Sequence, residues 1–313
     1  PEHEEVFVYP VPLLSSSLLF VACKKTDPPV TKSLLELAST KTELSTFLAA
    51  MERAGLSGTL NSNGSFTVFA PTNAAFTAYL AANGYANLEA VPVATLKQLL
   101  QYHTLIGELK SGSITKSYVA SLATFGTSTS VLKLYLENTG TVLINNSATV
   151  TTADLSAGNG VLHVVNKVIT LPKVVDFIQN DLTLSAFLVA LTRADLSIDY
   201  FATLTELGPF TVFAPDNAAF ASLLIELGLD NINDIPADML NTILQYHIVP
   251  NANLSADQLE DTQELTTLGG RKFSINAGNK LTDQQGRQGN LITLDIQANN
   301  GVVHSLDRVL RPN

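Results

Sequence analysis

Four histidines in this chain occupy matched positions, two in each half. His103 matches His247 after 144 residues, and His163 matches His304 after 141 residues. Histidine is the side chain whose ordinary pKa lies nearest to neutral pH, so a matched set can supply general bases or metal ligands. The chemistry to consider first is therefore acid–base catalysis or metal binding.

The spacing of these residues does not match the common catalytic or metal-binding motifs. The sequence has no H-E-x-x-H segment, no cysteine cluster and no G-x-S-x-G turn. Asp154 and Asp295 also match, but neither lies in a run of oxygen ligands such as an EF-hand loop. We therefore predict no catalytic residue, no metal and no cofactor. A hydrolase that uses a matched histidine and aspartate is the remaining enzymatic alternative.

One phrase occurs twice and orders the rest of the chain. FTVFAPTNAAF at residues 66–76 returns as FTVFAPDNAAF at residues 210–220, and the only change is from Thr72 to Asp216. Phe-Thr-Val-Phe is typical of a strand, proline ends it, and threonine and aspartate are both good helix N-caps. The repeat therefore predicts a strand, a cap and a helix in each of two copies of one unit.

Two further motifs follow the phrase in each copy. LLQYH at 99–103 and ILQYH at 243–247 end a predicted helix, and the apolar residues behind them indicate that the helix passes into a strand. NGVLHVV at 159–165 and NGVVHSL at 300–306 are predicted to be a turn and a strand. Helices followed by several short strands predict an α+β unit.

The order of these motifs resembles the fasciclin-domain family, with both signature blocks and the Tyr-His between them present twice. The resemblance covers about residues 33–311. It implies an α+β fold with two fasciclin-like units, each a wedge-shaped β-sandwich flanked by α-helices. We predict a first module at residues 33–171 and a second module at residues 172–313. Family members are mostly extracellular or membrane-attached adhesion and matrix-interaction modules.

The resemblance also implies a binding role for Tyr102, His103, Tyr246 and His247, because the Tyr-His motif of animal relatives is linked to adhesion. That animal partner does not transfer to a chain with a bacterial type of lipidation motif. The structural alternative is a half-buried pair whose ring ends hydrogen-bond to neighbouring backbone. We favour the structural alternative.

A structural role is also the favoured interpretation for the other matched pairs. His163 and His304 each lie in an alternating strand directly after a turn, where a ring nitrogen can tie down a neighbouring loop. Asp154 and Asp295 each lie just before the final hairpin. We expect their carboxylates to make turn or loop hydrogen bonds rather than to hold a cation.

Residues 1–23 are predicted to be a signal segment, and residues 24–32 a linker. The apolar run up to Ala22 has about the length of a signal h-region, and Cys23 after it resembles the lipobox cysteine of bacterial lipoproteins. Phe20 in place of leucine, an acidic start and no initiator methionine depart from that motif. The alternative is an uncleaved apolar arm. Two or more acyl chains on Cys23 would anchor the protein to a bacterial membrane.

Composition limits the partners. The 313 residues carry a net charge of −10, which argues against a nucleic-acid partner because nucleic acid requires a basic surface. We predict a non-enzymatic, lipid-anchored protein of the cell envelope, periplasmic or surface-exposed, that presents two modules to a protein or polysaccharide. The alternative is a periplasmic small-ligand-binding or accessory protein with a pocket between the two units, near residue 171.

Overall fold

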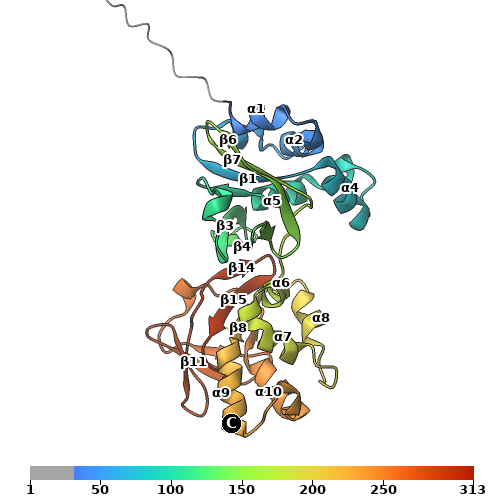
Figure 1. Cartoon of the computed structure of the whole chain (residues 1–313). Coiled ribbons are helices and arrows are strands. Elements are labelled where there is room, and N and C mark those ends of the chain that lie inside the picture. Colours follow the sequence, from blue (N-terminus) through green and yellow to red (C-terminus); the bar gives the residue numbers. More distant parts are fainter. Residues whose placement is uncertain (1–31) are drawn as a thin grey trace, which may run out of the picture. The chain divides into compact units, whose positions relative to one another are not determined.

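The computed structural model describes residues 32–313 (Figure 1). The predicted signal segment, Cys23 and all but the last residue of the predicted linker lie outside the described residues. Both modules contain helices and strands, and the α+β prediction is confirmed. The order of helices is the same in the two modules, with helices before and around the repeated phrase and most strands after it, and the second module has one strand more.

The first module contains five α-helices and seven strands. Its helices are α1 (Leu34–Ser39), α2 (Ser45–Arg53), α3 (Ser57–Asn61), α4 (Asn73–Ala82) and α5 (Val93–Tyr102). Its strands are β1 (Phe66–Pro71), β2 (Thr104–Ile106), β3 (Ser117–Thr124), β4 (Val131–Asn138), β5 (Val142–Ile144), β6 (Ala148–Ala157) and β7 (Gly160–Val165). Three 3-10 helices, Thr42–Leu44, Leu88–Ala90 and Ser111–Ser113, lie in its connections.

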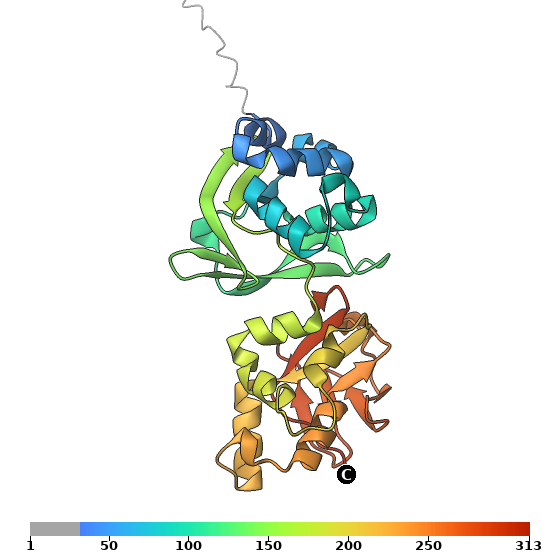
Figure 2. The same ribbon diagram turned by 90° about the vertical axis from the view of Figure 1, so that its right-hand side faces the viewer.

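The strands of the first module form one sheet in the order β2-β1-β7-β6-β5-β4-β3. Strand β1 is parallel to β7, a pairing that the sequence patterns did not predict. Side chains alternate across β1, so Val68 packs with the helices and Phe69 packs with Leu132 and Leu134 of β4. Figure 2 shows the blue-to-cyan helices of this module gathered on one side of its strands.

The close pairing of β1 with β7 explains the Asn-Gly motif at the start of β7. Gly160 has φ +144°, and a Cβ there would lie 2.0 Å from the carbonyl oxygen of Phe66. Gly301 of the second module has φ +149° and the same conflict, at 2.1 Å from the carbonyl oxygen of Phe210. Only glycine allows the two strands to approach this closely.

The second module repeats the plan with shorter strands. Its helices are α6 (Val174–Asn180), α7 (Ser185–Leu191), α8 (Tyr200–Thr205), α9 (Asn217–Leu227) and α10 (Ala237–Tyr246), with 3-10 helices at Leu182–Leu184, Ile232–Asp234 and Ala256–Gln258. Its strands are β8 (Phe210–Pro215), β9 (Ile248–Pro250), β10 (Glu264–Thr266), β11 (Lys272–Asn276), β12 (Lys280–Thr282), β13 (Gln288–Asn290), β14 (Ile296–Ala298) and β15 (Gly301–Leu306).

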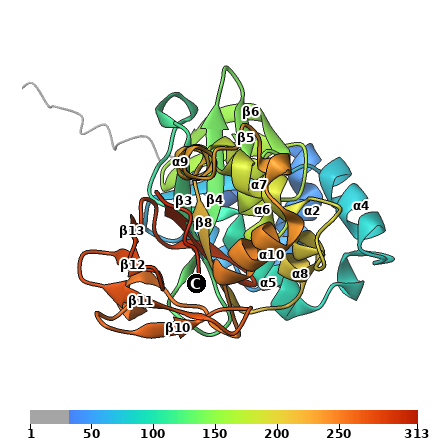
Figure 3. The same ribbon diagram turned by 90° about the horizontal axis from the view of Figure 1, so that it is seen from below.

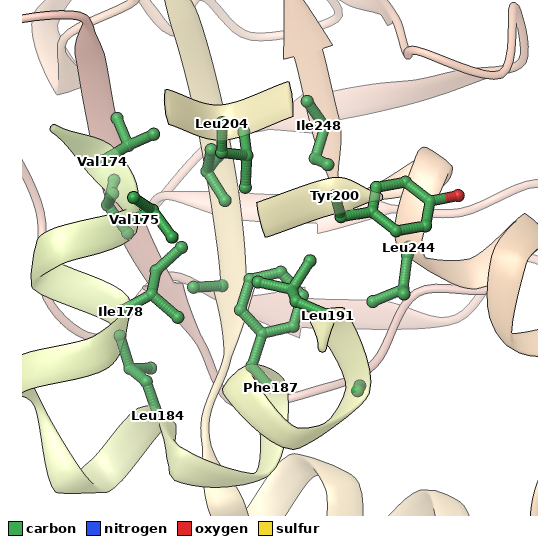
Figure 4. Packing of buried hydrophobic residues seen from close by; sticks show 14 of the residues in the cluster. Val174, Val175, Ile178, Leu184, Phe187, Leu191, Tyr200, Leu204, Leu244 and Ile248 are labelled. Atoms are coloured by element: carbon green, nitrogen blue, oxygen red, sulfur yellow. The ribbon is translucent and has the colours of Figure 1, made fainter. Parts of the chain in front are cut away.

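Two sheets and a helix layer make up the second module. One sheet has the order β14-β15-β8-β9. The other has the order β10-β11-β12-β13, and its four strands are labelled in Figure 3. Helix residues such as Phe187 and Tyr200 form the core on one face of the first sheet (Figure 4). Phe213 of β8 points to the other face, where it packs against Phe273 of β11. The predicted β-sandwich flanked by helices is thus confirmed.

The repeated phrase folds as predicted. The backbone N–H of Ala75 donates to Thr72 Oγ1 at 3.2 Å, and that of Ala219 donates to Asp216 Oδ1 at 2.7 Å. Both N-caps are confirmed, so the one substitution in the phrase keeps the cap. Each strand ends at its proline, and the helix begins two residues later.

Buried side chains pack around the predicted boundary near residue 171. The Tyr118 hydroxyl donates to Asp181 Oδ2 at 2.9 Å, and the Tyr118 ring meets Phe177 edge-on at 5.5 Å between centroids. Tyr135 is 2% exposed and belongs to the same apolar cluster as Val174. Among residues 32–313, no single helix is long and apolar enough to cross a membrane, and one bent pair, Val174–Asn180 with Leu182–Leu191, meets the length and composition criteria only jointly.

Candidate functional site

The two Tyr-His pairs lie in the interior, where α5 and α10 pass into the next strand. Tyr102, His103 and His247 are 0% exposed, and Tyr246 is 1% exposed. No ligand in solvent reaches these side chains while the modules are folded as described. Direct binding through them stays a prediction, and their burial favours the structural alternative.

His103 is held by two backbone groups of opposite kind. Its Nδ1 donates to the carbonyl of Leu99 at 2.8 Å, and its Nε2 accepts from the N–H of Ile169 at 2.9 Å. His247 makes the matching bonds in the second module at 2.8 and 3.0 Å. A carbonyl only accepts and an N–H only donates, so each ring is neutral with its proton on Nδ1. Burial accordingly lowers the pKa of both histidines to about 4.

The tyrosines connect the helix ends to the strands beyond. The Tyr102 hydroxyl donates to the carbonyl of Lys133 in β4 at 2.6 Å, and it accepts from Asn145 Nδ2 at 2.9 Å. The Tyr246 hydroxyl donates to the carbonyl of Lys272 in β11, also at 2.6 Å. Burial raises the pKa of both hydroxyls, that of Tyr246 to about 12. Each tyrosine hydroxyl therefore remains neutral and donates a hydrogen bond that fixes the backbone of one lysine, Lys133 or Lys272.

The second pair of histidines fixes loops, as predicted. His163 Nε2 donates to the carbonyl of Leu109 at 2.9 Å, and its Nδ1 accepts from the N–H of Asp154 at 3.2 Å. His304 makes the same two contacts, with the carbonyl of Leu254 at 2.9 Å and the N–H of Asp295 at 3.3 Å. Burial lowers the pKa of both rings.

The carboxylates of the matched aspartates hydrogen-bond to loop groups rather than to the histidine rings. Asp154 accepts from the backbone and hydroxyl of Ser111, and hydrogen bonding by Ser111 lowers its pKa. Asp295 accepts from the backbone of Ala256 at 2.7 Å. The loop hydrogen bonds are confirmed, and within residues 32–313 no hydrogen bond joins the carboxylate of Asp154 or Asp295 to a matched histidine ring. Residues 32–313 also contain no group of three or more metal-ligating side chains of the His, Cys, Asp and Glu types.

The sequence patterns did not predict the role of Asn159 and Asn300, which precede the glycines at the close approach of the parallel strands. Asn159 accepts from the N–H of Leu34 at 2.8 Å and donates to the carbonyls of Leu60 and Ser62 at 2.9 and 3.0 Å. Asn300 makes the same three kinds of contact in the second module. Each asparagine thus joins the first helix of its module to the last hairpin. The signal was present, since the asparagine is repeated at a matched place.

A surface cavity lies beside each of the two lysines, Lys133 and Lys272, whose backbone carbonyl accepts a hydrogen bond from a buried tyrosine. The β11 cavity, about 520 Å³, is lined by Glu264, Gly270, Arg271, Lys272, Phe273, Ser274, Thr282, Asp283 and Gln284. The β4 cavity, about 370 Å³, is lined by Ser128, Thr129, Ser130, Val131, Lys133, Ser255, Asp257, Gln258, Asp295 and Gln297, from both modules. The buried tyrosines and these cavities are therefore connected through the backbone of β4 and β11.

Comparison with known families settles the fold family. The model of the family described as Fasciclin domain matches residues 42–172 and again residues 183–312. The chain belongs to the fasciclin-domain family. The two matched segments contain both copies of the repeated phrase and both Tyr-His pairs. The resemblance and the tandem arrangement are thus confirmed, and neither match indicates a catalytic family.

Relatives of this fasciclin-domain chain come from animals and bacteria. It is 30% identical over 287 residues to transforming growth factor-beta-induced protein ig-h3 of Sus scrofa. The aligned region covers 91% of this chain and 38% of that protein. The chain is 30% identical to human periostin over 270 residues, 81% of the chain and 29% of that protein. Protein sll1483 of Synechocystis sp. is 37% identical over 151 residues, 47% of the chain and 77% of that protein. The chain thus spans well under half of ig-h3 and of periostin.

A solved structure confirms the fold of the pair. The FAS1 domain pair from the insect cell adhesion molecule fasciclin I superimposes with a TM-score of 0.55 at 17% sequence identity. The match covers 86% of this chain and 96% of that one. At this identity the likeness concerns the fold alone.

Proposed function

We propose that this protein is a non-enzymatic binding protein of the cell envelope that presents its two fasciclin modules to a protein or polysaccharide partner. The observation that carries the proposal is that the four matched histidines use both ring nitrogens in hydrogen bonds to backbone groups. Because the matched titratable residues serve the fold, function falls to the surface. The occurrence of a FAS1 pair in an insect cell adhesion molecule supports adhesion as that function.

The test is a binding screen with the full chain. We expect the folded protein, immobilised on beads, to retain at least one ligand from arrays of matrix proteins and polysaccharides. The matched control is the same protein unfolded in urea, which keeps composition and charge but removes the surface. Equal capture by folded and unfolded protein, or no capture at all together with unchanged adhesion of a deletion strain, would contradict the proposal.

Lipid anchoring at Cys23 is a second part of the proposal. It is supported by the apolar run before the cysteine, which has the length of a signal h-region. Expression in a bacterial host with an alkyne-labelled fatty acid should label the wild-type chain and leave Cys23→Ser unlabelled. Ser16→Ala, inside the same apolar run, is the control and should label normally. Labelling of Cys23→Ser would contradict lipid anchoring at Cys23, and the binding proposal would be unaffected.

A small-ligand role between the modules has one observation in its favour. The β4 cavity is lined from both modules, by residues such as Lys133 and Asp257. Near residue 171 itself, buried aromatic contacts such as that of Tyr118 with Phe177 occupy the interior. A thermal-shift screen of small polar metabolites tests this role, with Asp257→Asn as the variant. Shifts that are identical in wild type and Asp257→Asn would argue against the β4 cavity as their site.

A further inference from the structure

We propose that the β11 cavity binds a carboxylate-bearing saccharide, such as a uronate unit of an acidic polysaccharide. This inference rests on the proposed function, and it adds the class of partner and the place where the partner binds. It is argued from the charges on the cavity wall, from its neutral hydrogen-bonding groups and from the difference between the two modules on the matched face.

Two cations lie on the wall of the β11 cavity in a chain that is acidic overall. Arg271 and Lys272 are adjacent and exposed at the start of β11. Lys272 Nζ lies 3.0 Å from Glu264, but the two side chains are 54% and 61% exposed. An ion pair this exposed is weak, because water screens both charges. A ligand carboxylate can therefore replace Glu264 beside Lys272 at little cost.

Asp283 also lines the cavity, yet its charge is already compensated. Its side chain is fully buried and accepts from Arg287 Nη2 at 2.6 Å and from the backbone N–H of Gln285, Arg287 and Arg311. A carboxylate with a guanidinium partner and three N–H donors exerts little repulsion on an incoming anion. The cavity therefore shows two cations and one weakly held acidic group to a ligand.

Arg271 is suited to a carboxylate. One Nη1–H donates to the backbone oxygen of Asn313. A guanidinium has five N–H donors in a planar fork, so others stay available for a bidentate bond to a carboxylate. Arginine is the side chain that most favours such planar, two-point recognition.

The neutral groups of the wall favour a saccharide over a peptide. Ser274 and Thr282 contribute hydroxyls, and Gln284 contributes an amide. Phe273 is 2% exposed and points into the core, so its ring offers almost no surface to a peptide side chain. Hydroxyls and amides can donate to and accept from sugar hydroxyls. The volume of about 520 Å³ lies within the range of roughly 300–1,000 Å³ that is usual for ligand sites.

The matched face of the first module is built differently. In β3 and β4, Tyr118 pairs across the strands with Tyr135. Tyr135 lies two residues after Lys133, whose carbonyl accepts from Tyr102. In β10 and β11 the corresponding pair is Glu264 with Ser274. The first module buries its aromatic pair against Phe177, whereas the second module has an acid and a hydroxyl there. The second module thus has a polar, solvated surface where the first has a packed aromatic one.

The test compares matched variants of the full chain by titration calorimetry against polygalacturonate, neutral dextran and poly-glutamate. Arg271→Gln with Lys272→Gln removes both cations of the cavity and keeps their backbone bonds. Lys280→Gln is the control, because Lys280 is an exposed lysine of β12 that does not line the cavity. Circular dichroism melts establish that all variants are folded.

We expect wild type and Lys280→Gln to bind polygalacturonate with affinities within about twofold, and the double variant to bind about tenfold or more weakly. Dextran should not bind, because it has no carboxylate. Equal affinity of wild type and the double variant would overturn this inference, as would no binding of polygalacturonate. Binding of poly-glutamate as tight as that of polygalacturonate would overturn the saccharide class. The proposed function survives all these outcomes if the binding screen captures another ligand.

Discussion

At the residue scale, each Tyr-His pair acts as a fixed internal connector. The histidine joins a helix end to the backbone after the last strand, as His103 does between Leu99 and Ile169. The tyrosine beside it joins the same helix end to β4 or β11. Because both side chains are adjacent, one dipeptide ties three distant segments together. This geometry explains the presence of the motif in both modules without a ligand.

The neutral histidines predict loss of stability in acid. His103 and His247 have a folded pKa of about 4, below the unfolded value of about 6.5. Their neutral forms therefore stabilise the fold fully above pH 6.5, and that stability is lost as the pH falls toward 4. Each histidine should remove about 1.4 kcal/mol of unfolding free energy per pH unit in this window. Urea unfolding at several pH values between 4.5 and 7.5 measures the slope.

A matched variant separates this effect from the titration of carboxylates. His103→Gln should be less stable at pH 7.5, because the side chain no longer satisfies both Leu99 and Ile169. Its stability should also fall less steeply between pH 6.5 and 5 than that of wild type, since one titrating ring is gone. An unchanged slope in His103→Gln would show that this ring does not titrate as its burial implies.

The tyrosine hydroxyls predict unequal costs in the two modules. Tyr102→Phe removes the hydrogen bonds of the hydroxyl to the Lys133 carbonyl and from Asn145 Nδ2, whereas Tyr246→Phe removes only the bond to the Lys272 carbonyl. We expect a loss of about 2–3 kcal/mol for Tyr102→Phe and about 1–2 kcal/mol for Tyr246→Phe. Urea unfolding of both variants at pH 7.5 is the measurement, and equal costs would show that the Asn145 contact contributes nothing.

At the scale of elements, the turn from strand to helix in the repeated phrase depends on the helix N-caps and on the parallel pairing of its strand. The asparagine after each cap also acts across elements, since Asn73 Oδ1 accepts from the N–H of Thr46 at 2.9 Å and Asn217 Oδ1 accepts from that of Ala186 at 2.9 Å. The phrase therefore holds an earlier helix against the one that it begins. Its sequence is identical in the two modules at the positions that make these contacts.

The approach of β7 to β1 predicts a severe effect of one methyl group. Gly160→Ala would place a Cβ 2.0 Å from the carbonyl oxygen of Phe66, at a φ of +144°. Neither backbone can move without breaking the parallel pairing, so we expect a loss of more than about 3 kcal/mol, or no folded protein. The control is Gly58→Ala, in α3 with no atom within 4 Å of the new Cβ. It should be neutral or stabilise by up to about 1 kcal/mol.

Thermal melts of Gly160→Ala and Gly58→Ala measure the cost of adding a methyl group where β7 approaches β1. A Gly160→Ala protein as stable as Gly58→Ala would mean that β7 does not lie against β1 in this register. The second module offers an independent repeat of the experiment at Gly301, where the conflict is with the carbonyl of Phe210.

At the scale of the whole molecule, aromatic contacts couple the two fasciclin modules. Tyr118→Ala removes the hydrogen bond to Asp181 and the ring contact with Phe177. We expect faster hydrogen exchange in α6 of the second module as well as a lower stability of the first. Tyr79→Ala is the control, since Tyr79 packs beside Tyr85 within the first module. It should destabilise the first module and leave α6 unchanged, and equal exchange of α6 in both variants would argue against coupling.

Strong local signals made much of the fold predictable. The strand, cap and helix of residues 66–76 follow from β-forming residues, a proline and a capping side chain, which act over a few residues. The parallel pairing of β1 with β7 was not predicted, because its partners lie far apart along the chain and no local signal marks them. The same holds for Asn159, whose partners Leu34 and Leu60 are distant in sequence.

The duplication, the α+β class, the resemblance to the fasciclin family and the caps can be predicted from the sequence, because each depends on repeated or neighbouring residues. The burial of Tyr102, His103 and their counterparts, and the cavity lined by Arg271 and Lys272, follow only from the folded chain. The physical reason is that burial depends on which segments cover a side chain. A Tyr-His dipeptide at a helix end has the same sequence whether it faces water or backbone groups of remote segments such as Lys133 and Ile169.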